Sequence, residues 1–291
     1  MPTNPYCNDS MKLTETIFDL PVPKNKTALM QHLQNLVLRG SCWWVGGIVP
    51  RHKFQNLALK FSVRYPLLRN ERGRTYDRSK GLAAFHFVAF PVEEGIAWWL
   101  MSTSGRNGLQ DESSPDYHVA KHALAANGHI VFGDYVLLYA HKKDARTVLD
   151  AKSGKEKQII KDCSTWTWKM TSSAYGEVAA AIKREVDALN YGDDSTQANF
   201  YGLRGVLAFQ RRRPLFAGVR AQVIQLHRLA DSDWSLVRKT WIARHRELAE
   251  PYGSKAGELL PIKEITSKYM PKMVRTKVFS TGTIGELISP S

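Results

Sequence analysis

The sequence predicts an α+β fold, with an antiparallel-sheet body, flanking helices and a helical, strongly basic C-terminal part. Three observations support this prediction. Two-residue alternation and short apolar runs recur between residues 57 and 170, as in strands, whereas apolar residues at helical spacing recur between residues 174 and 248. The hydrophobic content of 43% is ordinary for a folded chain, and more than half of the net positive charge lies within residues 204–246.

Changes in composition along the chain predict four parts. Residues 1–26 contain four prolines and are expected to form an N-terminal arm, and residues 27–190 form the sheet-rich α+β body. A Gly- and Asp-containing segment, 191–199, marks the start of a basic helical region over residues 191–250. A basic, proline-containing extended tail over residues 251–291 completes the chain.

The body is expected to begin with a helix and to continue mainly with strands. Apolar residues at helical spacing predict a helix over residues 27–38, which Gly40 ends. Alternation of apolar and polar residues predicts a strand over residues 57–65, which Pro66 ends. The other expected strands share short apolar or alternating runs: 81–90, 96–103, 129–132, 135–140, 147–149, 158–160 and 165–170.

The remaining helical segments are predicted from their apolar stripes. An alanine-rich stretch predicts a helix over residues 116–126, and a longer stripe predicts one over residues 174–189. After Pro214 a further helix is expected, and Asp231 or Ser232 is placed to cap a second one that buries Trp234. These two helices resemble a helix-turn-helix in outline only.

Positive charge is concentrated in two segments. Residues 204–246 carry ten basic and two acidic side chains, and residues 51–80 carry nine basic and two acidic ones, in a chain of net charge +14. Turn-forming residues predict that 69–80 is a loop between strands, which together with 204–246 forms one phosphate-binding groove. The basic residues predicted to bind nucleic acid are Arg69, Arg72, Arg74, Arg78, Lys80, Arg211, Arg212, Arg213, Arg220, Arg228, Arg238, Lys239 and Arg246.

Aromatic residues accompany these basic segments, as in sites that stack unpaired bases. Tyr76 lies within the 69–80 segment, and Trp166 and Trp168 share one face of an expected strand. Trp166 and Trp168 are predicted as stacking platforms, with burial in the core as the alternative.

Motifs that carry catalysis or hold a cofactor are missing from the sequence. It contains no phosphate-binding glycine loop, no dinucleotide fingerprint and no Cys-x-x-Cys pair, and Lys121 between His118 and His122 disfavours a cation there. No metal and no cofactor are therefore predicted. For metal-independent RNA cleavage the sequence offers three candidates: His141 and Lys142 at a strand end, and His86 within a strand.

These observations favour a cytoplasmic nucleic-acid-binding protein, with RNA or single-stranded DNA preferred. The expected role is a component of a nucleoprotein complex in RNA-guided, replication or mobile-element machinery, with other protein subunits as further partners. Two alternatives remain: a metal-independent, RNA-processing endoribonuclease, and an interaction subunit that binds acidic protein partners. No apolar run approaches the ~20 residues of a membrane span, so no membrane partner is expected, and the three scattered cysteines fit a reducing compartment.

Overall fold

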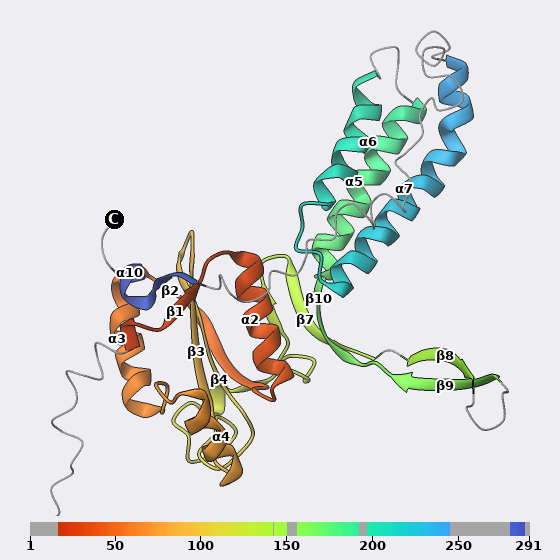
Figure 1. The fold of residues 1–291 in the computed structure, drawn as a ribbon. Coiled ribbons are helices and arrows are strands. Elements are labelled where there is room, and N and C mark those ends of the chain that lie inside the picture. The colour runs from red at the N-terminus through yellow and green to blue at the C-terminus, as the bar shows by residue number, and fades with distance from the viewer. Residues whose placement is uncertain (1–16, 142, 150–155, 192–196, 245–279, 289–291) are drawn as a thin grey trace, which may run out of the picture. The chain divides into compact units, whose positions relative to one another are not determined.

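A computed structural model describes residues 17–141, 143–149, 156–191, 197–244 and 280–288 (Figure 1). The chain divides into two compact units. The first comprises Met1–Ile130, Leu137–Trp166 and Val274–Ser291, and the second comprises Val131–Val136 and Thr167–Met273. Each unit is described by itself below.

The first unit contains a four-stranded antiparallel sheet. Its strand order is β3-β4-β2-β5, and the strands are β2 (Trp43–Val49), β3 (Phe85–Val92), β4 (Gly95–Ser102) and β5 (Lys121–His122). β3 and β4 form a hairpin in which Phe85 pairs with Ser102 and Val92 with Gly95. Gly95 has a φ of 145°, and a Cβ there would overlap the Val49 carbonyl oxygen, so only glycine fits this turn.

Two helices lie on opposite sides of the β3–β4 hairpin (Figure 1): α2 (Lys26–Leu38) and α3 (Arg51–Arg64). Asn25 caps α2 by accepting a hydrogen bond from the Ala28 backbone N–H at 2.9 Å. On the other side, α3 buries Phe54 and Phe61, whose rings lie 6.1 and 5.9 Å from that of Phe87. This aromatic cluster forms the core between α3 and the sheet.

Segments from both ends of the described chain pack on the first unit. Strand β1 (Pro21–Pro23) pairs antiparallel with β11 (Ser280–Thr283), and α10 (Ile284–Ile288) follows directly. Ile17 and Ile284 are buried in the α3-side core. Residues 17–26 and 280–288 thus belong to the folded body, although the sequence predicts an arm and an extended tail there.

The second unit is dominated by three helices, which Figure 1 shows side by side: α5 (Ser172–Tyr191), α6 (Gln197–Gln210) and α7 (Ala217–Arg244). Their buried side chains are Ala174, Val178, Ile182, Val186, Leu203, Leu207, Val219, Val223, Leu226, Ala230 and Trp234. The Gln222 side chain of α7 accepts from the Met170 N–H at 2.7 Å and donates to the Met170 carbonyl at 3.2 Å, which ties the helix to a strand. The burial of Trp234 confirms its predicted place in the core.

The remaining strands are short. β6 (Ile130–Phe132), β7 (Tyr135–Ala140) and β10 (Thr165–Met170) form a three-stranded sheet in the order β10-β7-β6. β8 (Lys143–Leu149) and β9 (Glu156–Asp162) pair as an antiparallel hairpin, and residues 150–155 between them lie outside the described residues.

Residues 57–65 are predicted as a strand, but residues 57–64 are helical and belong to α3, and Tyr65 is its C-cap. The alternating apolar residues hide a second pattern, because Phe54, Ala58 and Phe61 recur at helical spacing and are buried. Val63, which belongs to the strand pattern, is 84% exposed. Both periods fit the sequence, and packing on Phe87 selects the helix.

Residues 69–80, predicted as a loop, contain the helix α4 (Glu71–Ser79). The Asn70 side chain caps it by accepting from the Gly73 N–H at 2.8 Å, and Gly81, with a φ of 71°, follows its end. The helix predicted over residues 116–126 is also wrong. A single 3-10 turn, η1 (Tyr117–Val119), and β5 stand there, because β5 pairs with the start of β2.

The two helices predicted after Pro214 are one continuous helix, α7, so the helix-turn-helix outline is wrong. Asp231 and Ser232 suit an N-cap, but no glycine or proline interrupts the chain there. The apolar stripe of Leu226, Ala230 and Trp234 runs through that point without a change of phase. Burial of one unbroken stripe favours one helix.

The α+β class and the antiparallel sheet with flanking helices are confirmed. The helices at 27–38 and 174–189 and the strands at 96–103, 135–140 and 165–170 lie where the periodicity places them, within a few residues. Among the described helices, none has both the length and the apolar character needed to cross a bilayer.

Candidate nucleic-acid interface

Helix α4 presents a row of cation, aromatic ring and cation on its exposed side. Arg72, Tyr76 and the C-capping Lys80 are four residues apart and so share one side of the helix. The Tyr76 side chain is 60% exposed, and the Lys80 Nζ lies 5.6 Å from its ring centroid. Arg72 is exposed, and the ion pairs that the described chain forms in this helix use Glu71, Asp77 and Arg78 instead. This row offers phosphate contacts beside a stacking surface.

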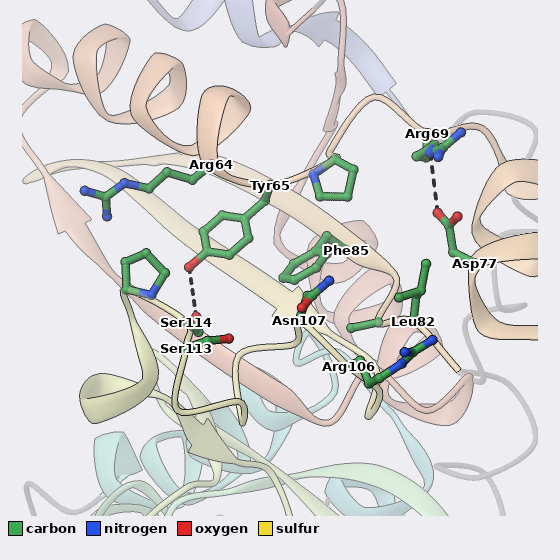
Figure 2. A pocket seen from close by; sticks show the side chains of 13 residues that line it. Arg64, Tyr65, Arg69, Asp77, Leu82, Phe85, Arg106, Asn107, Ser113 and Ser114 are labelled. Atoms are coloured by element: carbon green, nitrogen blue, oxygen red, sulfur yellow. Dashed lines mark hydrogen bonds and ion pairs between the residues drawn. The ribbon is translucent and has the colours of Figure 1, made fainter. Parts of the chain in front are cut away.

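A pocket of about 430 Å³ lies next to α4 in the first unit (Figure 2). It is enclosed by the end of α3, the connector at 65–69, Asp77 of α4, residues 82–85 and the segment 106–115. Its volume is in the range of small-ligand sites, roughly 300–1,000 Å³. The pocket is therefore large enough for a ligand of nucleotide size.

The middle of the pocket is aromatic. The rings of Tyr65 and Phe85 lie 4.8 Å apart between centroids and are tilted by 32°. The Tyr65 hydroxyl donates to Asp116 Oδ2 at 2.6 Å and lies 3.2 Å from the Ser114 hydroxyl. Burial and this carboxylate raise the pKa of Tyr65 to about 12, so the hydroxyl stays protonated near neutral pH. The ring is thus fixed in place by a hydrogen bond at its tip.

Charge is distributed unequally between the two ends of the pocket. Figure 2 shows Arg64 at one end and Arg69, Asp77 and Arg106 at the other. Arg64 is paired with Asp116 at 3.7 Å, and Arg69 with Asp77 at 3.4 Å. Arg106 donates to the Lys80 carbonyl at 3.2 Å and has no carboxylate partner among the described residues. The Arg69–Arg106 end therefore carries the excess positive charge.

Asn107 lies between these ends in an unusual backbone conformation. Its φ of 61° is the only positive value at a non-glycine residue in the described part of the chain. The Asn107 N–H donates to Asp111 Oδ2 at 3.0 Å, which holds the segment in this shape. Hydrogen bonds from Asn107 and Ser113 lower the pKa of Asp111, which keeps this acceptor ionised. The side-chain amide of Asn107 lines the pocket.

Arg74, predicted to bind phosphate, has a structural role instead. Its guanidinium donates to the Phe85 carbonyl and to the Leu67 carbonyl, each at 3.1 Å. Burial lowers the pKa of Arg74, as expected for a cation drawn into the protein. The side chain is committed to joining the connector before α4 to the start of β3.

Replacing Arg74 by Ala is expected to destabilise the first unit by about 1–3 kcal/mol, because it leaves two carbonyl groups short of a donor. Urea unfolding followed by circular dichroism measures this loss. Arg72→Ala, which removes the same charge from an exposed site, is the matched control and should leave stability within about 0.5 kcal/mol of wild type. Equal stabilities of the two variants would contradict the structural role of Arg74.

The other basic residues predicted around α4 are accessible to different degrees. Arg69 and Arg78 are 54% and 37% exposed and take part in ion pairs, with Asp77 at 3.4 Å and Glu71 at 3.8 Å respectively. Lys80 is exposed beside Tyr76. These three side chains, with Arg72, remain available to a polyanion.

In the second unit, Arg213 is committed to internal contacts. Its guanidinium donates to Gln210 Oε1 at 2.6 Å, to Asp134 Oδ2 at 3.1 Å and to the Tyr135 hydroxyl at 3.2 Å. Although burial alone would lower it, the Tyr135 and Asp134 contacts raise the pKa of Arg213. The side chain is only 12% exposed, so its charge is used within the second unit and phosphate binding by Arg213 stays a prediction.

The remaining basic residues of the second unit lie on or near its surface. Arg212, Arg228 and Lys239 are exposed, and Arg211, Arg220 and Arg238 are half-buried. Arg228 and Lys239 lie opposite the buried stripe of α7, separated by about 16 Å at 1.5 Å per residue. Arg246 lies outside the described residues. Because the two basic segments belong to different units, the groove that combines them stays a prediction.

Trp166 and Trp168 are not stacking platforms. Their side chains are 5% and 0% exposed. The ring of Trp166 meets Tyr139 edge-on at 5.5 Å between centroids, and Trp168 packs on Phe216 at 6.5 Å. The core alternative is therefore correct for both residues.

The predicted catalytic residues are not assembled into a site. His86 lies in β3 near His32 of α2, and burial, followed by the charge of Arg74, lowers the pKa of His86 to about 3, which makes it a poor base near neutral pH. His141 is exposed at the end of β7, edge-on to Tyr139 at 5.0 Å. Lys142 lies outside the described residues. Within those residues, no group of three His, Cys, Asp or Glu side chains is placed to hold a metal ion.

The sequence reasoning missed most of the pocket. Arg106, Asn107, Ser113 and Ser114 were not candidates, because their segment contains turn-forming residues and no periodic pattern. One signal was present, since the Ser-Gly-Arg-Asn-Gly run at 104–108 places a cation in a tight turn.

Comparison of the chain with protein-family models, with curated proteins and with solved structures finds no match.

Proposed function

We propose that this chain is a cytoplasmic nucleic-acid-binding protein that prefers RNA or single-stranded DNA and acts within a nucleoprotein complex. The observation that carries the proposal is the exposed row of Arg72, Tyr76 and Lys80 on α4. The two cations can contact successive phosphates, and the exposed ring between them can stack on an unpaired base. Two chain-wide properties support it, namely the net charge of +14 and its concentration in two segments.

The exposed cations of the second unit support the same proposal. Arg212, Arg228 and Lys239 have no described ion pair and face solvent. The separation of Arg228 and Lys239 along α7 fits contacts to the backbone of a polyanion better than contacts to one small anion. RNA-guided, replication or mobile-element machinery is the setting we propose for such a component.

Tyr76→Ala is expected to weaken binding to single-stranded oligonucleotides about tenfold or more, because stacking on an aromatic side chain contributes about 1–3 kcal/mol per base. Tyr76→Phe retains the ring and should bind like wild type, so it is the matched control. Fluorescence anisotropy with RNA, single-stranded DNA and duplex DNA over a salt series measures both effects.

The wild-type affinity should fall steeply as salt rises, since binding releases counterions from phosphates. Negligible affinity at low salt, or affinity that does not depend on salt, would overturn the proposal. Binding of acidic proteins without competition by nucleic acid would favour the interaction-subunit alternative. Metal-independent cleavage of RNA that is lost in His141→Ala would favour the endoribonuclease alternative.

A further inference from the structure

We propose that the pocket beside α4 binds one unpaired nucleotide, with its phosphate at the Arg69–Arg106 end and its base against the apolar middle, which Pro66 and Pro115 line together with Tyr65 and Phe85. The identity of the strand that supplies this nucleotide rests on the proposed function. The pocket itself is argued from its own charge, shape and hydrogen-bonding groups.

The position of the phosphate follows from the distribution of charge. The Arg64 end is neutral, because Asp116 lies 3.7 Å from the guanidinium. At the other end Asp77 lies 3.4 Å from Arg69 and neutralises that one cation, which leaves Arg106 without a carboxylate. An arginine whose fork is only partly used by a backbone carbonyl is suited to hold two oxygens of a phosphate.

The position of the base follows from the middle of the pocket. Tyr65 and Phe85 are 5% and 3% exposed and form the aromatic floor of the pocket (Figure 2). Pro66 and Pro115 line it with rigid, exposed rings, which supply most of the apolar surface open to a base. The Tyr65 hydroxyl already donates to Asp116, so the ring contributes packing surface rather than a free donor. A flat heterocycle fits such a lining.

Groups that can read the edge of a base surround this aromatic side. The Asn107 amide offers both a donor and an acceptor, and Ser113 and Ser114 offer hydroxyl groups. Asn107 makes no side-chain hydrogen bond within the described part of the chain. Its φ of 61° lies in the left-handed region, which asparagine adopts more readily than most residues, and this turn carries the amide to the pocket lining.

The nucleotide must be unpaired. A volume of about 430 Å³ holds one nucleotide and excludes a stacked base pair. Paired bases keep their edges and faces inside the duplex, so a pocket of this kind admits only bases that have left the stack. Because Asp77 lines the pocket while Arg72, Tyr76 and Lys80 occupy the exposed side of the same helix, neighbouring nucleotides have a surface to follow.

Calorimetric titration of the full chain with UMP, dUMP, AMP and inorganic phosphate tests the pocket directly. The nucleotides are expected to bind more tightly than phosphate, and Arg106→Gln should weaken them about tenfold. Asn107→Gly preserves or relieves the backbone conformation, so it should fold normally and still weaken the nucleotides severalfold. The matched control, Arg184→Gln, is at an exposed arginine of α5 outside both the pocket and the α4 row, and it should leave nucleotide affinity unchanged. UMP and dUMP differ only in the 2′-hydroxyl and separate an RNA site from a DNA site.

Two results would overturn the pocket: phosphate binding as tightly as the nucleotides, which would indicate an anion site only, or equal effects of Arg106→Gln and Arg184→Gln. Oligonucleotide binding separates this proposal from the proposed function. If oligonucleotides bind with salt dependence but Arg106→Gln and Asn107→Gly behave like Arg184→Gln, the pocket fails and the function stands. If nucleotides bind through Arg106 but oligonucleotides do not bind, the function fails and the pocket stands.

Discussion

A Trp168→Ala variant is expected to lower the free energy of unfolding of the second unit by about 3–5 kcal/mol. Trp168 is 0% exposed and packs on Phe216. The strand that carries it is tied to α7 on both sides, because Thr167 Oγ1 accepts from the Gly218 N–H at 2.9 Å and Gln222 bonds to Met170. The cavity left at Trp168 cannot collapse without breaking these hydrogen bonds. Most of the loss in unfolding free energy that the cavity causes is therefore expected to remain.

Denaturant unfolding monitored by circular dichroism measures the effect in the helices of this unit. Trp168→Phe keeps an aromatic ring and should lose less stability, while the exposed Tyr76→Ala should be close to wild type. A Trp168→Ala protein that unfolds like wild type but binds nucleic acid more weakly would restore the stacking role that its burial argues against.

The first unit is expected to lose stability steeply as the pH falls below about 6.5. Burial, reinforced by Arg39 and Arg74, lowers the pKa of His32 to about 4, and burial and Arg74 lower that of His86 to about 3. A histidine whose pKa is lowered by folding is protonated first in the unfolded chain. The contribution of His32 and His86 to the free energy of unfolding is therefore fully present above the pKa of histidine in the unfolded chain. It is lost as the pH falls toward the pKa values of the folded state.

Each of these two histidines contributes about 1.4 kcal/mol per pH unit in that window. Urea titrations at pH 7, 6, 5 and 4 measure the slope. His86→Gln removes one ionisable group, so it should reduce the slope of the unfolding free energy against pH below 6.5 by about 1.4 kcal/mol per pH unit. His141→Gln, at an exposed site, should leave that slope unchanged. An unchanged slope in His86→Gln would contradict the neutral, buried state of this histidine. In the second unit, burial and Arg211 lower the pKa of His227 to about 4, so its stability should change in the same direction.

The spacing of apolar residues along the chain was sufficient to predict many of the helices and strands. The helix at 27–38 and the strands at 96–103 and 135–140 have one period each, and the structure places them there. Residues 54–65 satisfy two periods at once, so only contact with Phe87 decides for the helix. Asn70 and Gly73 fit a turn and a helix cap equally well, and α4 was missed for that reason.

The candidate site was less accessible to sequence reasoning. Folding does not change which residues carry charge, so the basic segments could be identified directly from the sequence. Whether a given arginine is available cannot be read in that way, since Arg72 and Arg74 are two residues apart, yet one faces solvent and the other holds two carbonyl groups. The pocket joins residues from 64 to 115 that share no motif.

The sequence by itself determined the α+β class, the order of most elements and the location of the positive charge, because these depend on residues close together in the chain. The tertiary structure decided which aromatic and basic side chains remain accessible. Trp168 and Tyr76 both accompany basic residues in the sequence, but one fills a core and the other projects from a helix. That difference arises from packing partners far away along the chain, and no local pattern encodes it.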